Sequence, residues 1–168
     1  MVRSGGIDLD RFYRINKEEA KKELNLSLKK RYLVWVGTIF AWSGLEILID
    51  AAAAISKKYD SIDFIIIGEG SERKNLMKTA GNKNILDRMI FTGYIPTANL
   101  YKWLSASDIA LAPYTRLRLD IEDFTSYKIY EYLACGLPVV CSYESGGSNI
   151  SYVNKYNFGK TAPPEDVN

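Results

Sequence analysis

Short runs of apolar residues recur along this chain, and they constrain its fold more than any other feature of the sequence. Each run has the length of a strand and is apolar at successive positions, which predicts a strand that is buried on both faces. The five clearest runs are 32–36, 64–67, 89–91, 109–112 and 139–141, and a shorter strand is expected near Phe158. Helical segments separate them, so the sequence predicts a doubly wound, parallel α/β sheet of the Rossmann-like kind.

The segments between the predicted strands carry helical patterns. A short exposed helix is predicted at 17–24, where helix-forming residues are concentrated, and a longer amphipathic helix is predicted from about Gly44. Further helices are expected over 71–80, over 99–105 and after Gly146-Gly147. Ligands of such sheets bind outside the carboxyl ends of the strands. One crevice should therefore be lined by the loops that follow the strands, at Gly37, Gly68, Gly93, Pro113 and Ser142.

The stretch from Asp123 to Pro138 predicts a helix that begins at this crevice. Ser126 or Thr125 is a good N-cap, and Gly136 lies where a helix ends in a left-handed residue. Between these ends, the residues expected to form the apolar face are Ile129, Tyr130, Leu133 and Ala134, and the opposite face carries Tyr127, Lys128 and Glu131.

The start of this helix has the chemistry of a diphosphate site. A helix N-terminus offers free N–H groups and the positive end of the helix dipole. Thr125, Ser126 and Lys128 add two hydroxyls and a cation, and the carboxylates of Asp123 and Glu131 suit the vicinal hydroxyls of a ribose or a hexose. The plain alternative is a surface ion pair between Lys128 and Glu131, worth ~0.3 kcal/mol. From chemistry alone the two interpretations are evenly balanced.

The spacing of the two carboxylates resembles the signature of a known protein family. Asp123 and Glu131 are eight positions apart, and Glu131 is followed by Tyr-Leu-Ala-Cys-Gly-Leu-Pro-Val-Val. This resembles the E-x7-E signature and the E-A-x-A-x-G-x-P-V-V pattern of the group 1 glycosyltransferases (family four), which have the two-domain GT-B fold. The chain departs from the pattern at Asp123, which replaces a glutamate, and at Tyr132, which replaces a small residue. The resemblance implies that residues 17–168 are the C-terminal, nucleotide-sugar-binding domain, one half of a GT-B fold.

The beginning of the chain fits the same family. The stretch from Gly5 to Phe12 resembles the N-G-V-D-x-x-x-F segment that follows the crossing from the N-terminal domain. Residues 1–16 are therefore expected to be an interdomain crossing segment in the middle of a longer protein, whose own N-terminal domain is the expected partner. That missing half would bind the acceptor, and a peripheral membrane or lipid-linked acceptor is left open.

The resemblance also implies an activity. It is the retaining transfer of a hexose from a nucleotide diphosphate sugar to an acceptor hydroxyl, in glycan or polysaccharide biosynthesis, with no cofactor and no metal required. The contact with the transferred sugar, the catalytic role, falls by position to Asp123, and the contact with the ribose falls to Glu131. The isolated domain is expected to be inactive.

Two other loops correspond to binding segments of the family. Residues 37–44 align with G-R-x-x-x-x-K-G, so Gly37 matches, whereas Thr38 and Ser43 replace the arginine and the lysine that hold the donor pyrophosphate. Lys128 and the helix N-terminus are expected to compensate for this loss. Tyr94 lies in the stretch that meets the nucleotide base, with a plain turn as an equal alternative. Trp42 either covers the crevice or packs inside.

The composition of the chain argues against several classes of function. The 168-residue chain has a formal net charge of +2 and no histidine, which argues against a nucleic-acid groove and excludes histidine catalysis and histidine metal sites. No apolar run approaches the ~20 residues of a membrane span. Cys135 and Cys141 are predicted to be reduced core thiols of a cytoplasmic protein.

Two rival functions stay open. A catalytically degenerate module that only binds a nucleotide sugar is favoured by the uncharged residues at positions 38 and 43. A receiver-like signalling domain ranks last, because it would need an acidic cluster at the end of the first strand.

Overall fold

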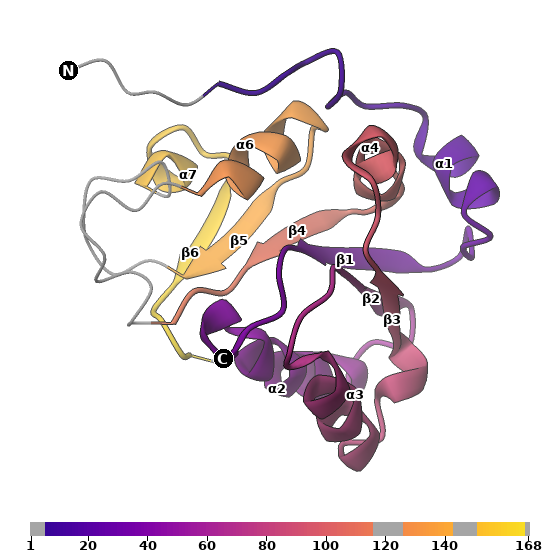
Figure 1. Cartoon of the computed structure of the whole chain (residues 1–168), viewed down its shortest axis with the longest axis vertical. Helices are drawn as coiled ribbons and strands as arrows, with labels where there is room; N and C mark the ends of the chain where they lie inside the picture. Colours follow the sequence, from indigo (N-terminus) through magenta and orange to yellow (C-terminus); the bar gives the residue numbers. More distant parts are fainter. Residues whose placement is uncertain (1–5, 116–125, 143–150, 167–168) are drawn as a thin grey trace.

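A computed structural model of the chain describes residues 6–115, 126–142 and 151–166 (Figure 1). Six strands form one sheet in the order β3-β2-β1-β4-β5-β6, and every neighbouring pair is parallel. The strands are β1 Arg31–Val36, β2 Ile62–Ile67, β3 Met89–Gly93, β4 Ile109–Ala112, β5 Val139–Ser142 and β6 Gly159–Ala162. The predicted doubly wound parallel sheet is confirmed, and its strands start within a few residues of the apolar runs.

Helices cover the two faces of the sheet, as Figure 1 shows. One face carries α2 (Leu45–Ser56) and α3 (Arg73–Asn82), and the other carries α1 (Lys17–Glu23), α4 (Thr97–Ala106), α6 (Tyr127–Ala134) and α7 (Ser151–Lys155). Short 3-10 turns stand at Ala41–Ser43 and Leu86–Arg88. The helices switch faces after β3, where the chain returns past β1 to form β4, so β1 is the switch point of the sheet.

Each face of the sheet has its own hydrophobic core because successive strand residues point to opposite sides. In β1, Tyr32 and Val34 join the core beneath α4 and α6, whereas Leu33 and Trp35 join the core beneath α2 and α3. Cys135 and Cys141 are buried free thiols in the first of these cores, as predicted from their apolar surroundings.

The amino end of the sheet is fastened by Asp108, which precedes β4. Its carboxylate accepts hydrogen bonds from the backbone N–H of Tyr32 at 2.9 Å and from the Lys17 ammonium at 2.6 Å. These bonds join α1, β1 and β4 at the edge of the sheet that is remote from the strand carboxyl ends.

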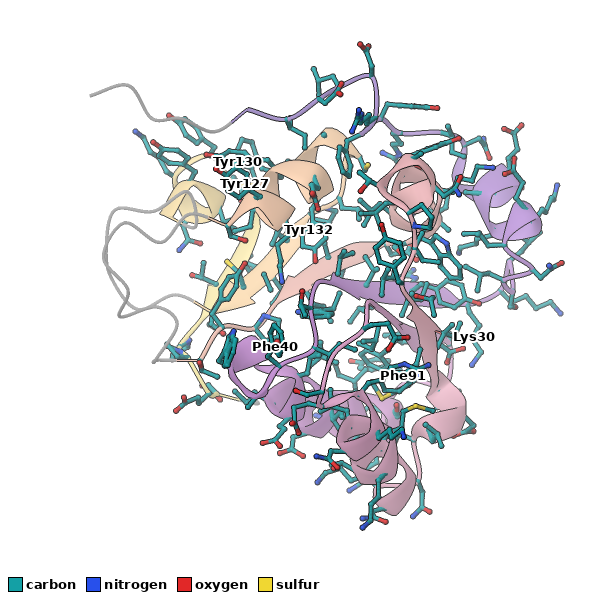
Figure 2. All side chains as sticks on the ribbon, viewed as in Figure 1. Lys30, Phe40, Phe91, Tyr127, Tyr130 and Tyr132 are labelled. Atoms are coloured by element: carbon teal, nitrogen blue, oxygen red, sulfur yellow. The ribbon has the colours of Figure 1, made fainter. Side chains whose placement is uncertain are left out.

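The apolar face of α6 differs from the prediction. Ile129 and Tyr132 are its buried residues, whereas Tyr130 is only partly buried. The pattern was misleading because a tyrosine fits either an apolar or a polar position. In Figure 2, the labelled Tyr127 and Tyr130 lie on the α7 side of the helix, and Tyr132 lies between α6 and the sheet.

Candidate nucleotide site

The carboxyl ends of the three strands β1, β2 and β3 form a close-packed backbone edge. The Gly37 N–H donates to the carbonyl of Ile67 at 3.0 Å, and the Gly68 N–H donates to the carbonyl of Gly93 at 2.9 Å. Gly68 has φ +139°, and a Cβ atom placed there would lie 1.8 Å from the Gly37 carbonyl oxygen. Only glycine permits this approach of two strand ends.

A pocket of about 520 Å³ opens above this edge. Its floor comes from the ends of β1 and β2, one wall comes from the start of α4 and the loop before it, and the other wall comes from α6. The lining residues are Val36, Gly37, Thr38, Ile67, Gly68, Glu69, Tyr94, Ile95, Thr97, Leu100, Lys128 and Glu131. The pocket therefore lies where the ends of β1, β2 and β3 predicted a ligand crevice. Pro113 and Ser142, which were expected to line the same crevice, line a separate pocket instead.

Lys128 supplies the cation among these lining residues. Its ammonium lies 4.5 Å from the centroid of the Trp35 ring and 5.7 Å from that of Tyr114, so aromatic faces hold it from below. Gly37 leaves room for it, because a Cβ atom at that position would come within 3.0 Å of Lys128 Nζ. The ammonium is thus held at the end of β1, where an anionic group would meet both the cation and the strand-end backbone.

Glu131 faces the same space one helical turn after Lys128. Burial raises the pKa of its carboxyl above the ordinary value, and the nearby Lys128 ammonium lowers that pKa in part. A partly buried carboxylate that lines a pocket is suited to accept hydrogen bonds from ligand hydroxyls.

Five of the predicted site residues line this one pocket: Gly37, Thr38, Tyr94, Lys128 and Glu131. Tyr94 stands at the rim with 72% of its surface exposed, where its ring is open to a flat ligand. Asp123 and Thr125 lie outside the described residues.

Ser43 and Ser126 are placed differently from the other predicted residues. The Ser43 hydroxyl is used within its own loop, and Ser43 does not line the pocket. Ser126 occupies the N-cap position of α6, but it is buried and makes no cap bond with its side chain. Its hydroxyl instead shares a hydrogen bond with the Tyr114 hydroxyl. The bond to the buried Tyr114 hydroxyl thus takes the place of the expected cap bond.

Several residues that contribute to the site were not predicted. Glu69 lines the pocket from the loop after β2, and its position between two glycines behind a buried strand was an available signal. The rings of Trp35 and Tyr114 make cation–π contacts with Lys128. Contacts between residues so far apart in the sequence leave no local pattern. Trp42 is 48% exposed and packs in a tilted arrangement against Phe40, with ring centroids 4.7 Å apart, so it is not a core residue.

The described residues contain neither a metal-binding cluster nor a membrane-spanning helix. No group of three or more carboxylate or thiol side chains is arranged to hold a metal ion in this part of the chain. Within the same residues, no helix has the length and apolarity needed to cross a membrane.

Comparison with known proteins gives consistent matches over nearly the whole chain. The family profile described as "Glycosyl transferases group 1" matches residues 16–167. The chain is 29% identical over 145 residues to the D-inositol 3-phosphate glycosyltransferase of Segniliparus rotundus, which covers 84% of this chain and 31% of that protein. It is 26% identical over 160 residues to a GDP-mannose-dependent alpha-(1-6)-phosphatidylinositol monomannoside mannosyltransferase of Mycobacterium tuberculosis, covering 89% of this chain and 40% of that protein. The chain thus spans between about a third and two fifths of the length of these relatives.

Solved structures with the same fold agree. HepE of Anabaena, solved in complex with UDP, superposes with a TM-score of 0.78 at 20% identity, covering 96% of this chain and 43% of that one. The C-terminal domain of LpcC from Francisella tularensis superposes with a TM-score of 0.73 at 19% identity, covering 96% of this chain and 82% of that domain. At these identities the superpositions establish the fold alone.

Proposed function

The chain belongs to the group 1 glycosyl transferases, and from that premise we propose that its pocket binds the nucleotide diphosphate part of a sugar donor. The chain would be the donor-binding half of a two-domain transferase that moves a hexose to an acceptor hydroxyl with retention of configuration. The acceptor would be bound by an N-terminal domain, and the isolated chain would bind the donor without transferring its sugar.

One observation carries this proposal. Lys128 and Glu131 lie on one wall of a single pocket, and the strand end at Gly37 forms its floor. A diphosphate needs a cation, and a ribose needs an acceptor for two adjacent hydroxyls. We assign the diphosphate to Lys128, the ribose to Glu131 and the base to the rim at Tyr94. Thr38, on the floor, is assigned as a further hydroxyl contact.

The same assignment accounts for the charge that would develop during sugar transfer. When the hexose leaves, the bond from its anomeric carbon to the diphosphate oxygen breaks, and a bond to the acceptor oxygen forms. Negative charge grows on the departing diphosphate, and the Lys128 ammonium would stabilise it most at that stage. The proton of the acceptor hydroxyl would pass to the departing diphosphate. Asp123 is assigned to the hydroxyls of the transferred hexose.

A second function is favoured by a specific observation. Neither Thr38 nor Ser43 carries charge, and the Ser43 hydroxyl is held inside its loop. A domain with a single cation among the described residues that line its donor pocket could bind a nucleotide sugar without turning it over. Turnover by the full-length protein separates this binding module from a transferase.

The test is a calorimetric titration of the chain with UDP, GDP and ADP. We expect one of them to bind in roughly the high-micromolar to millimolar range, equivalent to about 4–6 kcal/mol. Glu131→Gln should weaken both the free diphosphate and the sugar nucleotide. Asp123→Asn should leave the free diphosphate nearly unchanged and should lower turnover of the full-length protein. Absence of binding by all three nucleotides would contradict the proposal.

A further inference from the structure

The two central strands of the sheet separate just below the pocket. β1 pairs with β2 over its whole length, up to Val36 opposite Ile67. On its other side, β1 pairs with β4 only at two positions, Leu33 with Ile109 and Val34 with Ala110. The ladder between β1 and β4 therefore ends before the strands do. Backbone groups of both strands are left without a ladder partner at the switch point.

The hydroxyl of Tyr132 fills this gap. It accepts a hydrogen bond from the Val36 N–H at 3.0 Å and lies 3.3 Å from the Leu111 carbonyl oxygen, to which it donates. The side chain is fully buried and reaches the strands from the underside of α6 (Figure 2). A tyrosine hydroxyl is both donor and acceptor, so one group satisfies two buried backbone groups that would otherwise be costly to leave unpaired.

This bridge joins the two sides of the pocket. On α6, Tyr132 directly follows Glu131 and lies four residues after Lys128, so its position sets the depth and rotation of the helix that carries both. On β1, its partner Val36 directly precedes Gly37 and itself lines the pocket. Beside the apolar packing of Ile129, Tyr132 therefore links the α6 wall to the strand-end floor through hydrogen bonds.

We propose that Tyr132 is a positioning residue for the donor pocket, which holds α6 at the gap between β1 and β4 so that Lys128 and Glu131 meet the same ligand. The inference rests on the proposed function. It assigns Tyr132 no contact with the donor, because the side chain is buried beneath the pocket. The inference predicts that removal of the Tyr132 hydroxyl weakens nucleotide binding by more than the loss of overall stability explains.

The test compares Tyr132→Phe with Tyr32→Phe. Tyr32 is a matched control because it is also buried, and its hydroxyl accepts a hydrogen bond from the Ser27 N–H at 2.9 Å at the opposite end of β1. Both variants should lose thermal stability. Only Tyr132→Phe should weaken binding of the nucleotide that the unsubstituted chain binds, by about five- to tenfold, the factor that one ordinary hydrogen bond is worth.

A second readout does not depend on the ligand. Amide hydrogen exchange at Val36 should accelerate in Tyr132→Phe relative to its neighbours in β1, and it should not do so in Tyr32→Phe. If Tyr132→Phe is too unstable to study, it is placed in the Gly81→Ala background, since Gly81 has open space around its Cβ position.

The outcomes separate the two proposals. Absence of nucleotide binding by the unsubstituted chain would overturn the proposed function and this inference with it. Binding that is equal in the unsubstituted chain and in Tyr132→Phe, or equal losses in both tyrosine variants, would overturn the inference alone.

Discussion

The Ser43 hydroxyl donates a hydrogen bond to the Thr38 carbonyl at 2.8 Å and accepts one from the Phe40 N–H at 3.0 Å. These bonds close the loop between β1 and α2 upon itself. The family resemblance expects a basic residue at position 43, where this chain has a residue that shapes the loop instead. Thr38 occupies the other basic position and lines the pocket.

Because of this loop structure, we expect two variants that restore a positive charge to differ in nucleotide affinity and in stability. Thr38→Arg places a guanidinium in the pocket and should tighten nucleotide diphosphate binding by about tenfold. Ser43→Lys should give no comparable gain and should cost roughly 1–2 kcal/mol of stability, because two loop hydrogen bonds are lost. Calorimetry and thermal denaturation measure both effects, and Ser43→Ala isolates the cost of the loop. Equal gains from both variants would show that residue 43 still reaches the ligand.

Replacement of Lys128, which supplies the cation in the pocket, should change the nucleotide affinity more than the substitutions at positions 38 and 43. Lys128→Gln should weaken nucleotide diphosphate by about ten- to hundredfold, as expected for loss of a charge-assisted hydrogen bond. The exposed Lys58, which follows α2, gives a control with the same change in net charge: Lys58→Gln should leave the affinity unchanged. Titrations at two salt concentrations distinguish local from long-range charge effects. Similar losses in both variants would place the phosphate elsewhere.

Glu131 should lower stability at neutral pH while it supports binding. Because burial raises its pKa in the folded protein, its contribution to stability is fully present below the ordinary glutamate pKa of about 4.3 and is lost as the pH rises through the raised value. Glu131→Gln should therefore be more stable than the unsubstituted chain at pH 7, and this difference should shrink toward pH 4. Denaturant unfolding across this range measures it.

The same substitution should weaken binding by roughly 1–3 kcal/mol, so stability and affinity should move in opposite directions. Glu19→Gln removes an exposed carboxylate from α1 and should leave the affinity unchanged. A stability difference that grows toward low pH would contradict the assigned burial of Glu131.

Two glycines should respond oppositely to alanine. Gly68→Ala should destabilise the fold by about 2–4 kcal/mol, because its Cβ would meet the Gly37 carbonyl and its φ is positive. Gly81 lies inside α3 with open space around its Cβ position, so Gly81→Ala should stabilise the protein by about 0.5–1 kcal/mol. Thermal denaturation measures both. A tolerated Gly68→Ala would mean that the ends of β1 and β2 can separate.

The sheet was predictable because its strands satisfy a simple requirement. Residues 64–67 are buried on both faces of a parallel sheet, so they must be apolar at successive positions, and the sequence displays this directly. The order of the strands follows from the switch at β1, and no local pattern encodes it. The premature end of the β1–β4 ladder was not predictable either, since the backbone N–H left there is paired by a tyrosine 96 residues after Val36.

The pocket was predictable where a residue's role follows from its position after a strand or on the exposed side of a helix. Gly37, Thr38 and Tyr94 follow strands, and Lys128 and Glu131 lie on the polar side of α6. Ser126 was expected to present its hydroxyl at the helix start. Its actual partner, Tyr114, lies 12 residues earlier in the sequence, and the choice between a backbone and a side-chain partner is made by tertiary packing.

The two cysteines of the chain are buried in the core beneath α6, so the rates at which they are labelled would report local unfolding of the protein. Burial raises the pKa of Cys135 and of Cys141 to about 12. Roughly one thiol in ten thousand is then ionised at pH 8, and the thiolate is the form that alkylating reagents attack. Labelling of the native protein must therefore wait for a structural opening that exposes the sulfur. Since one thiol follows α6 and the other lies in β5, their separate labelling rates would tell whether the helix detaches before the sheet comes apart.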